Sequence, residues 1–309
     1  MKIAVIMGGI SSEREVSLNS GKEIYNNLDR NKYDVVKVVI NNKKDIFTKL
    51  TDDIDFAFIA LHGKFGEDGC IQSILETMDI PYSGCGPLSS GMCMDKNITK
   101  KILRQSNVPT ADWLVVNSID KINYDEIDKI GYPVFIKPNC GGSSIATFLI
   151  NSREEVHNAV SKVLEIDELA MIEKYIPGEE YTSFILNGEV FPTISIKAQS
   201  EFFDYHSKYT ENGAIEEIIY LEDNLQSQIN QLSKTCWDIF NCKAYVRVDM
   251  IISDGIPYVL ELNTLPGMTK TSLIPRSAAS KGIGFSELLD KIIEYSLDLE
   301  SPLDLEPTI

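Results

Sequence analysis

Two neighbouring apolar segments near the end of the chain carry charged and amide side chains. Residues 244–263 read as two strands around a turn, with Arg247 and Asp249 in the first strand and Glu261 and Asn263 in the second. Side chains alternate between the faces of a strand, so each pair shares one face. A buried carboxylate is costly unless a cation or hydrogen bonds compensate it. Carboxylate and amide oxygens are ligands that hard divalent cations prefer, which predicts a Mg²⁺ site that serves phosphates.

The metal hypothesis depends on how the two strands pair. With a two-residue turn at Asp254 and Gly255, Asp249 would lie opposite Leu260, and Glu261 would point to the other face. A loop with an odd number of residues, with Gly255 at a positive-φ or bulge position, puts Asp249 and Glu261 on one face. We therefore predict the odd loop. The alternative is a hairpin whose charges lie on the surface.

Bulk properties restrict the class of protein. The chain has 309 residues, enough for two or three subdomains, and a net charge of −17. It contains no basic run or stripe, which argues against nucleic acid or an anionic membrane as a partner. Its six cysteines form no CxxC pair, and no apolar run approaches the about 20 residues of a membrane span. We expect a soluble cytoplasmic protein with free thiols.

The N-terminal part predicts a parallel sheet. Strand patterns at 2–7, 34–40 and 56–61 alternate with helical stretches. Ligands of such sheets bind at the carboxyl ends of the strands, where Gly8-Gly9 and the polar, glycine-rich segment 62–69 lie. The alternative for each segment is a glycine turn that precedes a helix.

A glycine-rich segment follows in the middle of the chain. Residues 138–144 join predicted strands at 134–137 and 145–150, and they contain no Walker P-loop pattern. A Gly-Gly-Ser-Ser segment between strands can still fold over phosphates with its backbone N–H groups and hydroxyls. Lys137 and Lys96 could meet the phosphate charge.

The next segments predict a hinge, a hairpin and a lid. Residues 173–180 contain a Pro-Gly turn between two strands. Asn187-Gly188 is a type I′ turn signal between strands at 180–186 and 189–196. Loop 198–216 is long and aromatic, which is typical of lids and binding loops. The alternative for this loop is a surface segment anchored by its aromatic side chains.

Eight motifs follow one another along nearly the whole chain. Together they resemble the D-alanine–D-alanine ligase family of the ATP-grasp superfamily, and eight motifs in family order are a specific signal. The motifs read Gly-Gly-Ile-Ser-Ser-Glu-Arg-Glu-Val-Ser (8–17), His-Gly-Lys-Phe-Gly-Glu-Asp-Gly (62–69), Met-Asp-Lys (94–96), Lys-Pro-Asn-Cys-Gly-Gly-Ser-Ser (137–144), Glu-Lys-Tyr (173–175), Phe-Phe-Asp-Tyr-His-Ser-Lys-Tyr (202–209), Arg-Val-Asp (247–249) and Glu-Leu-Asn-Thr-Leu-Pro-Gly-Met-Thr (261–269).

The resemblance implies an α/β chain with an ATP-grasp fold behind an N-terminal, Rossmann-like parallel-sheet subdomain. Residues 1–85 would form the N-terminal substrate-binding domain, and residues 86–176 the small central ATP-grasp domain. Residues 177–309 would form the C-terminal ATP-grasp domain, with the metal site and the loop 198–216.

The resemblance also implies where ATP binds, between the central and C-terminal domains. The phosphates would meet Lys96 and Lys137, and Lys208 would face ATP from the long loop. The segment 173–176 would face adenine through its backbone, and Glu180 would meet the ribose. The implied ATP contacts are Lys96, Lys137, Ser143, Ser144, Glu173, Lys174, Tyr175, Ile176, Glu180 and Lys208.

Substrate and catalytic residues are implied in the same way. Glu13 would bind the ammonium of the first D-alanine and form a hydrogen-bonded trio with Ser143 and Tyr209. Arg247 and the Gly267 N–H would stabilise an oxyanion. His62 would lie near the first substrate, and Ser272 and Leu273 would contact the second, whose carboxylate Ser272 would hold. Asp249, Glu261 and Asn263 would hold two Mg²⁺ ions, for which Mn²⁺ could substitute, and a monovalent cation such as K⁺ is a further expected cofactor.

The implied reaction joins two D-alanines for peptidoglycan precursor synthesis, through D-alanyl phosphate, with release of ADP and phosphate. The resemblance implies a homodimer. Relatives that use D-serine or D-lactate as acceptor are the nearest alternatives, and Tyr209 favours an amine acceptor over D-lactate. An alternative of another class is an ATP-binding regulatory protein without turnover.

Two positions depart from the family pattern. Ala146 stands in the glycine-rich loop where the family usually has glycine, and Ser73 replaces a second usual glycine. Alanine restricts φ where glycine is free, so we expect an effect of Ala146 on loop flexibility and on ATP affinity. Neither change removes a proposed ligand.

Overall fold

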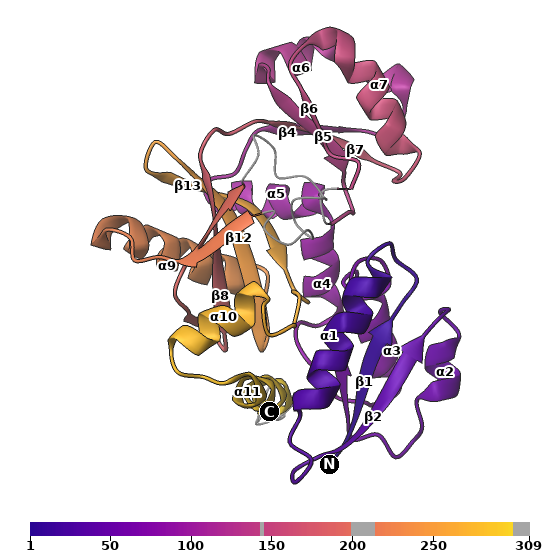
Figure 1. Ribbon diagram of the computed structural model, residues 1–309. Helices are drawn as coiled ribbons and strands as arrows, with labels where there is room; N and C mark the ends of the chain where they lie inside the picture. Colours follow the sequence, from indigo (N-terminus) through magenta and orange to yellow (C-terminus); the bar gives the residue numbers. More distant parts are fainter. Residues whose placement is uncertain (143–144, 199–213, 299–309) are drawn as a thin grey trace, which may run out of the picture.

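Three separate β-sheets organise the molecule. The computed structural model describes residues 1–142, 145–198 and 214–298. Each sheet forms its own lobe, and the chain passes from the N-terminal lobe to the central lobe and then to the C-terminal lobe (Figure 1). Each sheet falls within one of the three predicted domains, whose boundaries stay a prediction.

The N-terminal sheet is parallel, as predicted. Its strands β1 (Lys2–Gly8), β2 (Asp34–Ile40) and β3 (Phe56–Ile59) lie in the order β2-β1-β3. Apolar residues fill β1 and β3 because helices and the rest of the core cover them on both faces. The helices of this lobe are α1 (Arg14–Asn27), α2 (Asp45–Lys49) and α3 (Cys70–Thr77).

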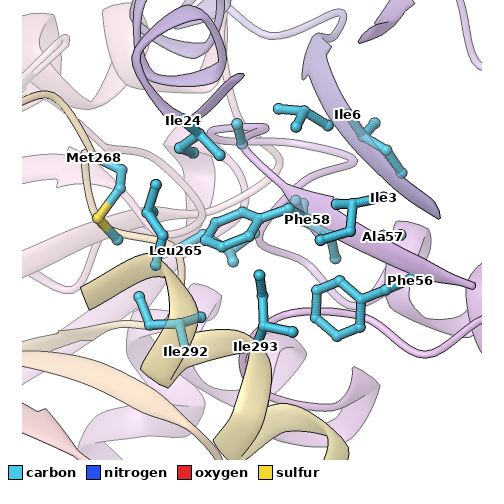
Figure 2. Close-up of a cluster of buried hydrophobic side chains, with 14 of the residues drawn as sticks. Ile3, Ile6, Ile24, Phe56, Ala57, Phe58, Leu265, Met268, Ile292 and Ile293 are labelled. Atoms are coloured by element: carbon cyan, nitrogen blue, oxygen red, sulfur yellow. The ribbon is translucent and has the colours of Figure 1, made fainter. Parts of the chain in front are cut away.

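The core of this lobe includes side chains from the far end of the chain. Phe58 packs in one buried cluster with Leu265 and Met268, from the loop that follows the predicted metal hairpin. Ile292 and Ile293, from the last helix α11 (Phe285–Asp298), complete the cluster (Figure 2). Burial of these apolar side chains stabilises the contact. The N-terminal lobe is therefore packed directly against the C-terminal part of the chain.

Two consecutive helices lead into the central lobe. Pro87, which the sequence indicates as part of a boundary, is the first residue of helix α4 (Pro87–Met94), a position where proline needs no N–H partner. Helix α5 (Lys96–Gln105) follows, and the Asp95 carboxylate accepts a hydrogen bond from the Ile98 N–H at its start.

The central sheet is antiparallel, with the order β4-β7-β5-β6. Helices α6 and α7 cover its outer face (Figure 1), so one face of β5 is buried and the other faces the rest of the molecule. The elements are β4 (Trp113–Val116), the 3₁₀ turn η1 (Ile119–Lys121), α6 (Tyr124–Ile130), β5 (Val134–Pro138), β6 (Phe148–Ile150), α7 (Arg153–Leu164) and β7 (Ala170–Lys174).

The C-terminal sheet has the order β11-β10-β8-β12-β13, with β9 paired to β8. Asn187 and Gly188 have φ of 46° and 77°, which confirms the predicted type I′ turn. The strand predicted over 189–196 is split near Pro192, which has no N–H for the ladder. The elements are β8 (Glu179–Leu186), β9 (Glu189–Val190), β10 (Ile194–Ala198), β11 (Ala214–Ile218), α9 (Asp223–Ile239), β12 (Tyr245–Ser253), β13 (Ile256–Asn263) and α10 (Leu273–Ser280).

The β12–β13 hairpin corrects one prediction and confirms another. Its turn contains only Asp254 and Gly255, with φ of 50° and 77°, so the predicted odd loop is wrong. Asp249 nevertheless pairs with Glu261, as predicted. The pairing shifts at Met250, which lies opposite Val259, so a bulge at residue 260 restores the shared face.

Helices of the described residues are all too short or too polar to cross a lipid bilayer.

Candidate active site

The polar face of the β12–β13 hairpin is closely packed with charge. Arg247 lies opposite Asn263, and Asp249 lies opposite Glu261. The Arg247 guanidinium donates from Nε to Oδ1 of Asp249 at 2.8 Å and from Nη2 to Oδ2 at 2.6 Å. Thr182 of β8 donates its hydroxyl to Asp249 Oδ1 at 2.6 Å. Burial opposes the charge of the guanidinium, but the neighbouring Asp249 outweighs burial and raises the pKa of Arg247.

The side chain of Asn263 shows whether this site suits a metal ion. Its Oδ1 is buried and has no hydrogen-bond partner among the described residues. A buried carbonyl oxygen without a partner is costly, unless a ligand completes it. The described residues hold no cluster of three His, Cys, Asp or Glu side chains suited to a metal. Two carboxylates, an amide oxygen and phosphate oxygens, however, fit the oxygen set of Mg²⁺.

Lys96 links this hairpin to the glycine-rich loop. It is the first residue of α5, and its Nζ lies 3.3 Å from Glu261 Oε2. Nζ also donates to the carbonyl oxygen of Gly141. The loop is held in turn by Asn139, whose Oδ1 accepts from the Asn97 N–H at 2.9 Å. The ammonium group of Lys96 therefore lies between the proposed metal ligands and the loop that is expected to cover phosphates.

The buried carboxylate of Glu173, on the sheet from which the glycine-rich loop leaves, pairs with two lysines. Glu173 of β7 is 2% exposed, and Lys137 at the end of β5 donates to its Oε2 at 2.5 Å. Lys100 forms an ion pair with the other oxygen, Oε1. Burial alone would raise the pKa of Glu173, but the two lysines hold it at about 2. Burial lowers the pKa of Lys100, whereas Glu173 outweighs burial at Lys137 and raises that pKa.

The segment predicted to face adenine is anchored through its own backbone. The Lys174 N–H donates to the Asp112 carbonyl at 2.8 Å, and the Tyr175 N–H donates to the Pro133 carbonyl at 3.1 Å. The ring of Tyr175 packs against Phe135, with centroids 5.7 Å apart. These N–H groups are therefore committed, which leaves the following residue, Ile176, as the N–H candidate for a nucleotide base.

Glu13, which the sequence predicts to bind the first substrate, lies where an N-terminal loop faces the glycine-rich loop. Glu13 directly precedes α1, and a methyl group added to Gly142 would lie 3.2 Å from its Oε2. A methyl group added to Gly63 would lie 2.9 Å from the same oxygen. Glycine at both positions therefore leaves room for the Glu13 carboxylate. Glu13 and the residue directly before Ser143 are thus brought together.

His62 belongs to a short chain of polar contacts. Its Nδ1 lies 3.6 Å from Glu67 Oε1, and its Nε2 lies 3.2 Å from the Ser20 hydroxyl. Ser20 Oγ also accepts a hydrogen bond from the Met268 N–H at 3.3 Å. Ser20 can then donate to Nε2 only if the proton of the ring is on Nδ1, toward Glu67. These contacts connect the segment 62–67 to Met268, the residue after Gly267.

The loop after β13 forms a compact turn at the start of α10. The Thr269 N–H donates to Ser272 Oγ at 3.0 Å, and the two hydroxyls lie 2.8 Å apart. A methyl group on Gly267 would lie 3.2 Å from the same Oγ. Ser272 precedes Leu273, the first residue of α10, so the Ser272 hydroxyl lies at a helix N-terminus, which favours a carboxylate.

Several predicted residues lie outside the described part of the chain. Ser143, Ser144, Lys208 and Tyr209 belong to this group, as does most of loop 198–216. Ala146 is described, and its φ of 53° is left-handed. The departure from the family glycine therefore falls at a position where alanine is strained by about 1 kcal/mol or more.

Sequence reasoning missed three residues of this site. Lys100 lies one helical turn after Lys96, and that spacing was a signal that both share a face. Ser20 and Thr182 each carry one hydroxyl, and nothing in their sequence context marks them.

Two family models of known proteins match this chain. A family model for the D-ala D-ala ligase N-terminus matches residues 2–52 and 43–85, and one for the D-ala D-ala ligase C-terminus matches residues 102–294. A D-alanine–D-alanine ligase from Clostridium botulinum is 55% identical over 97% of this chain and 100% of its own length.

Solved structures agree with these matches. A Bacillus anthracis D-alanine–D-alanine ligase, complexed with ATP, has 48% identity and a TM-score of 0.89, over 97% of this chain and 98% of that one. A D-Ala:D-Ser ligase from Enterococcus faecalis has 28% identity and a TM-score of 0.82, over 96% of this chain and 99% of that one.

Proposed function

The chain belongs to the D-alanine–D-alanine ligase family, and we propose how its own residues divide the work of the reaction. The enzyme has the ATP-grasp fold and joins two D-alanines to D-alanyl-D-alanine at the expense of ATP. The dipeptide serves peptidoglycan synthesis.

The first step activates a carboxylate, which is otherwise a poor acyl donor. An oxygen of the first D-alanine attacks the γ-phosphorus of ATP, the bond to the bridging oxygen of ADP breaks, and D-alanyl phosphate forms. Glu13 holds the ammonium of that D-alanine. Lys96 and Lys137 offset the charge of the phosphates, together with Lys208. Support comes from the contact of Lys96 with both Glu261 and the Gly141 carbonyl.

Asp249, Glu261 and Asn263 would hold two Mg²⁺ ions, or Mn²⁺ in their place. The ions, when bound, neutralise phosphate charge during transfer. The proposal is supported by the cross-strand pairing of the two carboxylates and by the unpartnered Oδ1 of Asn263. K⁺ as a further activator stays a prediction.

The second step forms the peptide bond. The amine of the second D-alanine attacks the acyl carbon, and phosphate leaves with the former carboxylate oxygen. Asp249 occupies Nε and Nη2 of Arg247, so the hydrogens of Nη1 are those proposed to bind the oxyanion, together with the Gly267 N–H. Ser272 holds the carboxylate of the acceptor. The trio of Glu13, Ser143 and Tyr209 is proposed to help remove the amine proton.

The nucleotide is proposed to bind between the central and C-terminal sheets. Ile176 would contact adenine through its N–H, and Glu180 would contact the ribose. Within the same segment, Glu173, Lys174 and Tyr175 shape the base site. Ser143 and Ser144 would close over the phosphates.

The observation that carries the proposal is the Asp249–Glu261 pair on one polar face beside Lys96. The test is an acceptor assay, in which dipeptide or depsipeptide formation is measured with D-alanine, D-serine and D-lactate across a range of pH. We expect D-alanine to be the preferred acceptor. ATP binding without phosphate release, whichever D-amino acid is present, would instead indicate an ATP-binding regulatory protein.

D-serine is the second candidate acceptor, because a D-Ala:D-Ser ligase shares the fold at a TM-score of 0.82. The same assay decides between the two, since D-serine would then give the higher kcat/KM. A cytoplasmic location is supported by six cysteines that are all free thiols. A homodimer is proposed from family membership and is tested by sedimentation velocity.

A further inference from the structure

Lys100 has no role in the steps above, yet it is among the largest fully buried side chains. Its side chain is 1% exposed, and it lies on α5 one turn after Lys96. A buried ammonium is costly unless several acceptors surround it. Nζ of Lys100 has such a set: a carboxylate oxygen of Glu173, the Thr110 hydroxyl at 2.7 Å and the Ala111 carbonyl at 3.3 Å.

These partners fix Lys100 in place. Thr110 donates its own hydroxyl hydrogen to the Val259 carbonyl at 2.9 Å, and the Val259 N–H donates to the Pro109 carbonyl at 2.8 Å. Val259 lies beside the bulge that turns Glu261 toward Asp249. Lys100 is therefore held between Glu173 and the strand that carries the proposed metal ligands.

Lys137 differs from Lys100 in one respect that matters. Both pair with Glu173, one on each carboxylate oxygen, but the side chain of Lys137 is 17% exposed. Lys137 also stands at the end of β5, directly before the glycine-rich loop. It can leave Glu173 and turn toward a ligand, whereas Lys100 cannot leave without abandoning three acceptors.

The departure of Lys137 raises a problem that Lys100 solves. Removal of one partner of a buried ion pair leaves an uncompensated charge, which is strongly unfavourable. If Lys137 were the sole counter-ion of Glu173, its transfer to ATP would expose the protein to that cost. With Lys100 on the other oxygen, Glu173 keeps a counter-ion throughout.

We propose that Lys100 is a positioning residue that acts as the permanent counter-ion of Glu173, so that Lys137 can exchange between Glu173 and the phosphates of ATP. This inference rests on the proposed contact between Lys137 and the phosphates. Without Lys100, the buried carboxylate retains Lys137, and ATP must compete with it. Loss of Lys100 should therefore weaken the binding of ATP, and only while Glu173 carries its negative charge.

The test is a pair of substitutions in two backgrounds. Lys100→Met is made in the wild-type protein and in Glu173→Gln, and KM for ATP, kcat and the affinity for MgADP by calorimetry are measured. In the wild-type background we expect KM for ATP to rise about tenfold or more, with kcat within about threefold. In the Glu173→Gln background, where no charge holds Lys137, Lys100→Met should leave KM for ATP unchanged. Lys101→Met, at an exposed position of the same helix, is the matched control and should change neither constant.

The outcomes separate this inference from the proposed function. An equal rise in KM in both backgrounds, or no rise in the wild type, overturns the role of Lys100. Lys137→Met is measured beside them, and it should raise KM for ATP in both backgrounds. If Lys137→Met leaves KM unchanged, the phosphate contact itself is wrong, and the inference falls with it.

Discussion

Replacement of Asn263 by leucine tests whether Asn263 serves to bind a ligand or to stabilise the fold. Oδ1 of Asn263 is buried without a partner among the described residues, so the ligand-free protein carries a desolvation cost of about 1–3 kcal/mol. Leucine has a similar shape and no polar atom, although a tighter fit costs part of the gain. We expect the free energy of unfolding to stay unchanged or to rise by about 1 kcal/mol. Turnover should fall at least about 100-fold, because a proposed metal ligand is lost.

Asn139 provides the matched control for this substitution. It is 1% exposed, and its Oδ1 accepts from the Asn97 N–H at 2.9 Å. Asn139→Leu leaves that donor unpaired and should lower the free energy of unfolding by about 1–3 kcal/mol. Urea unfolding without Mg²⁺ and nucleotide gives the stabilities, and phosphate release against Mg²⁺ gives the activity. If Asn263→Leu destabilises as much as Asn139→Leu, or keeps its Mg²⁺-dependent activity, the assignment of Asn263 as a metal ligand is wrong.

Three further predictions concern other parts of the site. Asp249→Asn or Glu261→Gln should abolish turnover with the fold retained, and full activity at ordinary Mg²⁺ in steady-state assays would contradict the metal assignment. The pKa of Glu173 is depressed from 4.5 to about 2, so the ionised carboxylate stabilises the folded state fully above pH 4.5 and loses this effect as the pH falls toward 2. Urea unfolding at a series of pH values should show a loss of unfolding free energy on the order of 3 kcal/mol, and Glu173→Gln should lack this loss. Ser20→Ala removes the acceptor of the Met268 N–H and should lower kcat about tenfold with KM for ATP unchanged, whereas unchanged kinetics would remove this contact from the mechanism.

Local patterns predicted those parts of the fold that local chemistry decides. The apolar run of β1 and the alternation in the β12–β13 hairpin indicated those strands. Asn187-Gly188 indicated the type of the turn between β8 and β9, since both residues tolerate a positive φ. Asp249 was predicted to face Glu261 for the wrong reason. The pairing is restored by a bulge at residue 260 of β13, and no residue type in that strand indicates a bulge.

Contacts between distant segments could not be predicted. Nothing in the sequence around Lys100 indicates a buried partner, because Glu173 lies far along the chain and only the fold brings the two together. The packing of Ile292 and Ile293 into the N-terminal core likewise depends on how the lobes meet (Figure 2). Motif order indicated the proposed roles of Glu13 and Lys96, but only the fold brings Glu13 to Gly142 and Lys96 to Glu261.

Phosphorylation of the D-alanine carboxylate before the peptide bond forms is tested most directly by isotope transfer. D-alanine labelled with ¹⁸O in both carboxylate oxygens is turned over with unlabelled ATP and water, and the released phosphate is analysed by mass spectrometry. We predict that each phosphate carries one ¹⁸O atom, because the oxygen that attacks the γ-phosphorus leaves with it. Phosphate without ¹⁸O, formed together with D-alanyl-D-alanine, would contradict the acyl phosphate route.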